Sequence, residues 1–211
     1  MKKIIIITSY IEYEFDLKSI IKKDDFVICT DGGMDIAMRQ RIIPGLLMGD
    51  MDSISSELPR DIPVEKFNPQ KDHTDLELAL QKAVSLGARE VVILGGMGGR
   101  LDHTMAAIQL LSRYAGCFSS LVMKDGRNMC FVLYGKKNLL HTIEYQADSY
   151  LSLFSLSEEC RGLTISNVKY PLEGHTLFRT FPLGVSNEFS GRKDALLSFD
   201  EGTLLVVISG K

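Results

Sequence analysis

The sequence has few cysteines and no excess of basic residues. Its four cysteines are scattered without a CxxC pair, a spacing that favours neither a zinc site nor a disulfide framework. The 24 Lys and Arg residues are outnumbered by 27 Asp and Glu residues, giving a net charge of −3. Proteins that bind nucleic acid usually present a basic face, so no nucleic-acid partner is expected.

Long apolar runs are also missing. No stretch of about 18 apolar residues occurs, so no helix is expected to span a membrane. The start "MKKIIIITSY" has two lysines followed by the apolar run Ile4–Ile7, which is shorter than the roughly 7–15 apolar residues of a signal peptide. This run is therefore interpreted as a first β-strand, and the protein is expected to be cytoplasmic.

Several familiar catalytic motifs are absent as well. The chain contains no G-x-x-x-x-G-K-[ST] string, and the glycines at 95–99 do not fit G-x-G-x-x-G, because the sixth position counted from Gly96 is Leu101. Neither HExxH nor G-x-S-x-G occurs. These absences argue against a Walker-type nucleotide site, an NAD-binding dehydrogenase, a zinc hydrolase and a serine hydrolase.

Short apolar runs alternate with helical patterns in the first part of the chain. Such alternation indicates an α/β domain with a mainly parallel sheet. The runs predicted as strands are 3–8, 25–30, 90–96 and 119–124, and the patterns predicted as helices are 76–87 and 103–115.

The pattern changes near the turn "YGKKN" at 134–138. The later runs are short, β-rich and broken by Gly, Pro, Asn or Asp, which is typical of a β-sandwich or barrel. The sequence therefore predicts an α/β N-terminal domain over 1–134 and an all-β, sandwich-like C-terminal domain over 135–211.

Three clusters of glycine and aspartate follow predicted strands of the α/β domain. They are "DGGMD" at 31–35, "GDMDS" at 49–53 and "GGMGGRLD" at 95–102. Ligands of open parallel sheets bind beyond the carboxyl ends of the strands, so the clusters are expected to converge on one edge. Glycines there allow backbone N–H groups to approach phosphate oxygens closely.

The aspartates of "GDMDS" indicate a cation. Asp50 and Asp52 repel each other unless a divalent ion neutralises them, and Mg²⁺ commonly takes one or two carboxylates together with substrate phosphates and water. Asp72 or Asp75 would supply a third carboxylate. The alternative is that these aspartates form turns and caps; for Thr74 and Glu77, which fit a capping box, that alternative is strong.

The motifs taken together resemble the thiamine pyrophosphokinase (thiamine diphosphokinase) family. "DGG", "GDMDS", "KDHTDLELAL" and "GGMGGRLDHTMAAIQLL" occur in the order and roughly the spacing of that family. In the second half, "GLTISNVKYPLEG", "GVSNEFSG" and the final "GTLLVVIS" agree with its thiamine-binding β-domain. The resemblance extends from about Thr30 to Ser209.

This resemblance implies a reaction and its cofactors. The family transfers a diphosphoryl group from ATP to the hydroxyethyl arm of thiamine, which gives thiamine diphosphate and AMP, and it requires Mg²⁺. Residues 1–134 would form the nucleotide- and metal-binding catalytic domain, and residues 135–211 the thiamine-binding domain. The family also implies a homodimer in which each active site is shared between two chains.

The resemblance also implies roles for particular residues. Asp50, Asp52 and Asp75 would hold Mg²⁺ and the triphosphate, and Asp102 would lie beside them as a further catalytic carboxylate. The residues expected near ATP are Asp31, Gly32, Gly33, Gln70, Thr74 and Arg100. Tyr170 would stack on the thiamine rings, and Ser186 and Asn187 would hydrogen-bond the aminopyrimidine.

Two other functions are weighed against this one. A diphosphokinase acting on a pterin would need similar contacts to its ring and its hydroxymethyl arm, but the β-domain motifs argue against it. A non-catalytic sensor of nucleotide or thiamine would need the cradle and the ring platform, yet it has little use for three metal-binding carboxylates. The sequence therefore favours an enzyme.

Overall fold

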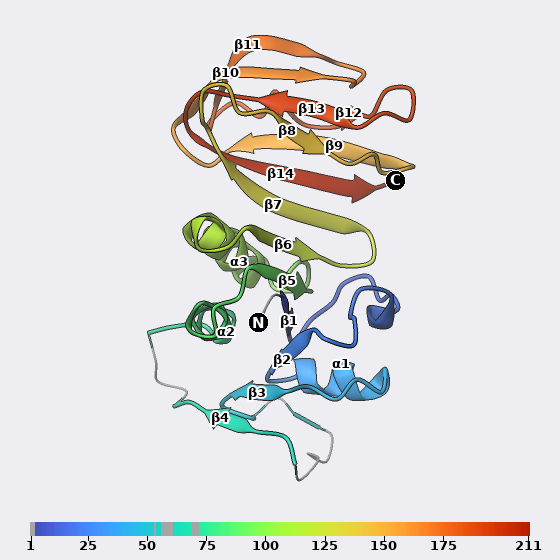
Figure 1. Ribbon diagram of the computed structural model, residues 1–211, viewed down its shortest axis with the longest axis vertical. Helices are drawn as coiled ribbons and strands as arrows, with labels where there is room; N and C mark the ends of the chain where they lie inside the picture. Colours follow the sequence, from blue (N-terminus) through green and yellow to red (C-terminus); the bar gives the residue numbers. More distant parts are fainter. Residues whose placement is uncertain (1–2, 53, 56–60, 69–71) are drawn as a thin grey trace. The chain divides into compact units, whose positions relative to one another are not determined.

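The computed structural model (Figure 1) describes residues 3–52, 54–55, 61–68 and 72–211. The chain divides into two compact units, Met1–Gly126 and Arg127–Lys211. The expected boundary follows residue 134, whereas the structure includes β7 (Asn128–Tyr134) in the second unit. That strand pairs along its whole length with β14 (Thr203–Gly210), the last strand of the chain.

The first unit contains a parallel sheet. Its strands pair in the order β4, β3, β2, β1, β5, β6. Ile4–Ile7 of β1 are fully buried, because a central parallel strand is covered on both faces and is therefore a continuous apolar run. The bounds are β1 Lys3–Ile7, β2 Phe26–Thr30, β3 Leu46–Gly49, β4 Val64–Lys66, β5 Glu90–Leu94 and β6 Ser120–Lys124.

Helices cover both faces of this sheet. Figure 1 shows α2 and α3 on one side and α1 on the other. The helices are α1 Gly33–Arg39, α2 Asp75–Ser85 and α3 Leu101–Tyr114, with short 3-10 turns η1 at Leu17–Ser19 and η2 at Ala115–Cys117. The predicted strands and both predicted helices are confirmed, and Gly87 (φ 68°) follows α2 in the left-handed conformation of a C-cap.

The order of the strands creates a switch point in the first unit. From β1 the chain moves outward in one direction through β2, β3 and β4, and β5 then pairs with the other side of β1. Loops that follow neighbouring strands diverge at such a point, which is where open α/β sheets bind ligands. The segments after β1, β2, β3 and β5 therefore share one edge.

The second unit consists of two antiparallel sheets. One contains β12, β9, β14 and β7 in that order, and the other contains β11, β10, β13 and β8. The remaining bounds are β8 His141–Ile143, β9 Ser149–Ser155, β10 Glu159–Ser166, β11 Leu172–Phe178, β12 Asn187–Glu188 and β13 Ala195–Ser198.

Alternate residues of these strands form the core of the second unit. Leu204, Val206 and Ile208 of β14 are buried with Leu163 of β10 and Leu197 of β13. Alternation of this kind buries one face of each sheet and leaves the other face for polar side chains. No residue of 127–211, all of which the structure describes, is helical, and the predicted fold class is confirmed.

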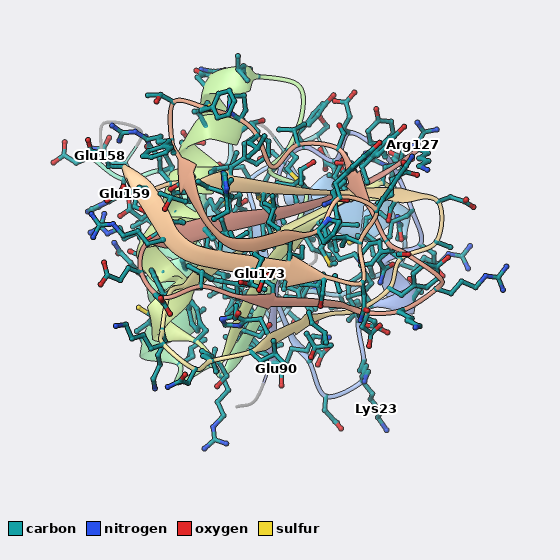
Figure 2. All side chains as sticks on the ribbon, turned by 90° about the horizontal axis from the view of Figure 1, so that it is seen from above. Lys23, Glu90, Arg127, Glu158, Glu159 and Glu173 are labelled. Atoms are coloured by element: carbon teal, nitrogen blue, oxygen red, sulfur yellow. The ribbon has the colours of Figure 1, made fainter. Side chains whose placement is uncertain are left out.

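Charged side chains lie mainly on the outside of each unit. Figure 2 shows the side chain of Lys23 extending away from the ribbon of the first unit. Among the residues that the structure describes, no helix is long and apolar enough to cross a membrane.

Candidate active site

Asp31 is a buried carboxylic acid at the end of β2. Its backbone has a positive φ of 41°, and its side chain accepts a hydrogen bond from the N–H of Met51 at 3.3 Å. The carboxyl packs against Gly49 at the end of β3, where a Cβ would lie only 1.7 Å from Asp31 Oδ1. Gly49 itself has a φ of 145°, so glycine is needed there both for space and for conformation.

Asp31 faces two other carboxylates, Asp75 and Asp50. Burial, together with a hydrogen bond to Asp75 and the negative charge of that residue, raises the pKa of Asp31 from 3.8 to about 7. The N–H of Met51 opposes this shift, and the charge of Asp50 makes a smaller contribution to it. Two carboxylates in hydrogen-bond contact cannot both ionise cheaply, so Asp31 keeps its proton through most of the acidic range in the absence of a cation.

Asp52 is the second aspartate of "GDMDS". It is exposed, and its backbone N–H donates to Asp50 Oδ1 at 3.1 Å. This is the turn expected when an aspartate accepts from the residue two positions later. The structure therefore brings together Asp31, Asp50 and Asp75, while the backbone of Asp52 holds the carboxylate of Asp50.

The first turn of α2 carries Asp75. Thr74 is the N-cap, and its Oγ1 accepts the N–H of Glu77 at 3.2 Å. The other half of a capping box would be a bond from Glu77 back to the N–H of Thr74. The side chain of Glu77 instead points to Arg113 of α3, with 2.7 Å between Oε1 and Nη1.

The glycine-rich loop after β5 is held by acceptors of the chain itself. Gly95, Gly96, Gly98 and Gly99 all have positive φ. Gly96 donates to the carbonyl of Tyr10 at 3.1 Å, Gly98 to Thr104 Oγ1 at 3.1 Å and Gly99 to Glu12 Oε2 at 3.2 Å. Of these three acceptors, only the exposed carboxylate of Glu12 is an anion. A phosphate oxygen that took its place would therefore give the N–H of Gly99 another anionic acceptor.

Glu12 and Tyr10 come from the segment that follows β1, which the sequence analysis did not select. The hydroxyl of Tyr10 donates to Glu12 Oε2 at 2.6 Å. No motif of glycine or paired aspartates marks this segment, and only the pairing of β1 with β5 brings it to the loop. It also borders a cavity of about 340 Å³, lined by Ser9, Tyr10, Ile11, Glu14, Gly32, Asp35, Ile36 and Arg39.

Arg100 and Asp102 form an exposed bidentate ion pair. Arg100 is the N-cap of α3, and Asp102 lies in the first turn of that helix. Arg100 Nε donates to Asp102 Oδ1 at 3.1 Å, and Nη2 donates to Oδ2 at 2.5 Å. The hydrogen bond from Arg100 lowers the pKa of Asp102, and the N–H of His103 lowers it further. Asp102 is therefore an anion at neutral pH that competes with any phosphate for Arg100.

The remaining predicted positions near ATP differ in what the structure says of them. Gly33 is required by packing, since a Cβ there would lie 2.2 Å from the carbonyl oxygen of Ile7. Gly32 borders the cavity described above. Gln70 lies outside the described residues.

The carboxylate group fits a Mg²⁺ ion only in combination with a ligand. Among the described residues, no set of three His, Cys, Asp or Glu side chains is arranged to hold a metal ion by itself. Mg²⁺ rarely uses an all-protein cage, however, and is usually bound by one or two carboxylates plus substrate phosphates and water. The Asp31–Asp75 pair, with Asp50 nearby, has the composition of such a donor set, and a cation there would relieve the repulsion that raises the pKa of Asp31.

In the second unit, Asn187 and Tyr170 are connected through the backbone of Tyr170. Asn187 Oδ1 accepts the N–H of Tyr170 at 3.0 Å, and Nδ2 donates to the carbonyl of Tyr170 at 2.8 Å. Oδ1 also accepts the N–H of Glu188 at 2.9 Å. The amide oxygen of Asn187 thus accepts two backbone hydrogen bonds within the protein. A direct contact of Asn187 with an aminopyrimidine stays a prediction.

The surface around Tyr170 is exposed. The Tyr170 side chain is 59% exposed, and Lys169 Nζ lies 5.5 Å from the centre of its ring. Ser186, next to Asn187, has a φ of 60° and donates its N–H to Ser152 Oγ at 3.0 Å. Tyr170, Ser186 and Asn187 therefore belong to one region of the second unit, with the aromatic ring available for stacking.

Comparisons with known proteins agree with this arrangement. The family model "Thiamin pyrophosphokinase, catalytic domain" matches residues 17–122, and "Thiamin pyrophosphokinase, vitamin B1 binding domain" matches residues 138–204. Thiamine pyrophosphokinase from Bacillus subtilis is 30% identical over 207 residues, covering 92% of each chain.

Solved structures give the same result. The crystal structure of thiamine pyrophosphokinase from Bacillus subtilis aligns with a TM-score of 0.90 and 26% identity, covering all of both chains. That of thiamin pyrophosphokinase from Geobacillus thermodenitrificans aligns with a TM-score of 0.86 and 29% identity, covering 100% of this chain and 98% of the other.

The raised pKa of Asp31 predicts a specific dependence of stability on pH. Between pH 3.8 and about 7 the folded state holds a proton that the unfolded state has released, so the free energy of unfolding should fall as the pH rises through this range. In Asp31→Asn this part of the decline should disappear. Urea denaturation at several pH values, without divalent cations, measures it.

The matched control is Asp24→Asn, which removes an exposed aspartate before β2, at the opposite end of the strand. Asp24→Asn should keep the decline. An unchanged slope in Asp31→Asn would mean that Asp31 is ionised in the folded protein throughout this range.

Proposed function

The chain belongs to the thiamin pyrophosphokinase family, and on this premise we propose that it transfers an intact diphosphoryl group from ATP to thiamine with the help of Mg²⁺, releasing AMP. Family membership makes the protein a transferase that uses ATP to convert thiamine into thiamine diphosphate. The proposal adds the metal, the leaving group, the residues that carry the reaction and the assembly.

One observation supports both the binding of a metal ion and its position. Asp31, Asp50 and Asp75 gather beyond the ends of β2 and β3 with charges that repel one another. Bound Mg²⁺ would supply the neutralising charge for the phosphate oxygens there. Asp50 and Asp75 would hold the ion, Asp31 would join them once it loses its proton, and Asp52 would keep Asp50 in place through its backbone N–H. Binding of the cation would then be accompanied by release of a proton.

The positive groups for the triphosphate lie at the start of α3. Arg100 and the N–H of Gly99 would meet phosphate oxygens after exchanging Asp102 and Glu12 for them. Each exchange replaces one anion by another, so it leaves no donor unpaired. Thr74 would serve this site indirectly, as the N-cap that starts α2 one residue before Asp75.

Thiamine would stack on the exposed ring of Tyr170. Asn187 supports this platform by holding both backbone polar groups of Tyr170. The hydroxyl of Ser186 remains as a group for the aminopyrimidine. Binding of thiamine then fixes the hydroxyl of its side arm, and positioning of this kind supplies a large part of the rate enhancement in phosphoryl transfer.

The products test the reaction. With ATP, Mg²⁺ and thiamine, AMP should appear in step with thiamine diphosphate, because attack at the β-phosphorus makes AMP the leaving group. Asp50→Asn should lower turnover about 100-fold or more through loss of charge stabilisation, with an unchanged thermal melt. Chromatography of nucleotides and thiamine esters measures both.

Formation of ADP with thiamine monophosphate would contradict diphosphoryl transfer. A product formed from a hydroxymethyl pterin, with none from thiamine, would assign the enzyme to the other substrate. Binding of thiamine and ATP without any product would identify a sensor.

Asn187→Ala should weaken thiamine binding by loosening the platform. We expect the KM for thiamine to rise about tenfold, which corresponds to about 1.4 kcal/mol, with little change in kcat. Since the effect acts through Tyr170, the double variant Tyr170→Ala/Asn187→Ala should be no worse than Tyr170→Ala. Additive losses in steady-state kinetics would instead indicate a separate contact between Asn187 and thiamine.

The proposed assembly is a homodimer with shared sites, in which Asp50 of one chain and Tyr170 of the other serve one thiamine. Large apolar side chains on the second unit support a covering partner: Tyr170, Phe178, Phe181, Leu183 and Val185 are all exposed. Twofold dimers are the commonest oligomers.

Mixing two inactive variants tests this arrangement. Asp50→Ala and Tyr170→Ala, unfolded and refolded together, should recover activity, since half of the sites in a mixed dimer carry neither change. The measurement is turnover alongside native mass spectrometry of differently tagged chains. Mixed dimers that remain as inactive as their parents would assign each site to a single chain.

A further inference from the structure

Glu77 is a buried carboxylate that the proposed reaction does not use. It lies in the first turn of α2, two residues after Asp75, and only 7% of its surface is exposed. Burying an ionised carboxylate without partners is costly. The contacts of Glu77 therefore show what holds this end of the helix.

Three side chains from two directions meet the carboxylate. Arg113 Nη1 lies 2.7 Å from Oε1, and the hydroxyl of Tyr114 lies 3.5 Å from the same oxygen. His73 Nδ1 lies 3.0 Å from Oε2. Arg113 and Tyr114 are at the end of α3, whereas His73 is in the segment that leads into α2, so Glu77 connects both to the first turn of α2.

These contacts fix the backbone on both sides of Asp75. His73 precedes the N-cap Thr74, and Thr74 is itself bonded to the N–H of Glu77. Asp75 lies between Thr74 and Glu77 in this turn, and its side chain meets the carboxylate of Asp31. The contacts of Glu77 therefore anchor the stretch of backbone from which the carboxylate of Asp75 reaches Asp31.

We propose that Glu77 is a positioning residue for the metal site: its ion pair with Arg113 holds the first turn of α2 so that Asp75 faces Asp31 at a separation that a divalent cation can bridge. This inference rests on the proposed function of the Asp31–Asp50–Asp75 group. Glu77 touches neither the cation nor a substrate in this account.

The two members of the pair make the proposal testable, because they carry opposite charges. Glu77→Gln removes a negative charge, and by charge alone it would weaken the binding of a cation. Arg113→Gln removes a positive charge, and by charge alone it would strengthen that binding. If the pair acts by position, both variants should weaken the binding of Mn²⁺ alone by about tenfold, as is typical when the support of a metal ligand is lost.

The experiment measures Mn²⁺ affinity by electron paramagnetic resonance of the free ion, in the wild-type protein and in both variants. The double variant should be no worse than either single one, since they break the same contact. The KM for thiamine should stay unchanged.

Glu65→Gln is the matched control. Glu65 of β4 pairs with Lys82 near the other end of α2, so this variant removes an equal charge and another anchor of the same helix, away from Asp75. It should bind Mn²⁺ as the wild type does. A loss equal to that of Glu77→Gln would overturn the proposal in favour of general loosening of α2.

Asp75→Asn separates failure of this inference from failure of the proposed function. If Asp75→Asn abolishes Mn²⁺ binding while Arg113→Gln leaves it unchanged or stronger, the metal site exists and the positioning role of Glu77 is wrong. If the wild type and Asp75→Asn bind Mn²⁺ equally or not at all, both the metal site and this inference are wrong. Should Glu77→Gln fail to fold, Arg113→Gln, whose changed side chain is 64% exposed, decides the question.

Discussion

The repulsion between the carboxylates of Asp31 and Asp75 is the constraint on which the site depends. Burial of Asp31 gives this repulsion its strength, because solvent screens it less. Burial in turn depends on Gly49, since a Cβ at that position would occupy the place of the carboxyl group. The glycine of "GDMDS" thus leaves the space that the Asp31 carboxyl group fills, and a cation would remove the repulsion that raises the pKa of Asp31.

The positive groups of the same edge are occupied by acceptors of the chain itself. Glu12 accepts the N–H of Gly99, and Asp102 binds Arg100 with both oxygens. These contacts keep the glycine loop and the start of α3 ordered when no anion is bound. A phosphate that displaced these contacts would gain only the difference in free energy between its own contacts and those it replaced. The affinity for phosphate would be lower as a result, while the loop and the start of α3 would keep their positions.

Local sequence patterns predict the elements of the first unit well, because β1, β2 and β5 are continuous apolar runs and both long helices have a helical apolar period. The helix α1 is not apparent from the sequence, since its seven residues, Gly33–Arg39, make too few turns to show a helical period. The predicted boundary misplaces β7 for a different reason. This strand belongs to the second unit because it pairs with β14, and the paired residues lie between 69 (Tyr134 with Thr203) and 81 (Asn128 with Ser209) positions apart in the chain.

The site is predictable to the extent that its residues follow strands. Asp31, Asp50 and Asp75 belong to motifs at strand or helix ends, so their convergence follows from the parallel sheet. Glu12 cannot be found in this way, because only the neighbouring position of β1 and β5 brings it to Gly99. The capping-box pattern of Thr74 and Glu77 predicts the N-cap correctly, but it gives no sign of Arg113, which lies 36 residues further along the chain.

Glu77 and Asp31 are two buried carboxylates that differ in the charge of their partners. Both are less than 10% exposed, and both therefore need compensation. Glu77 obtains it from a guanidinium within the fold, so its charge is satisfied and a cation has nothing to add. The groups that act on Asp31 among the described residues are a backbone N–H and two further acids. None of these groups carries a positive charge that would stabilise the ionised form of Asp31. The same first turn of α2 connects the two acids, since it carries Glu77 on the side of α3 and Asp75 on the side of Asp31. In the proposed arrangement the ion pair of Glu77 with Arg113 would therefore hold the turn from which Asp75 meets the carboxylate of Asp31.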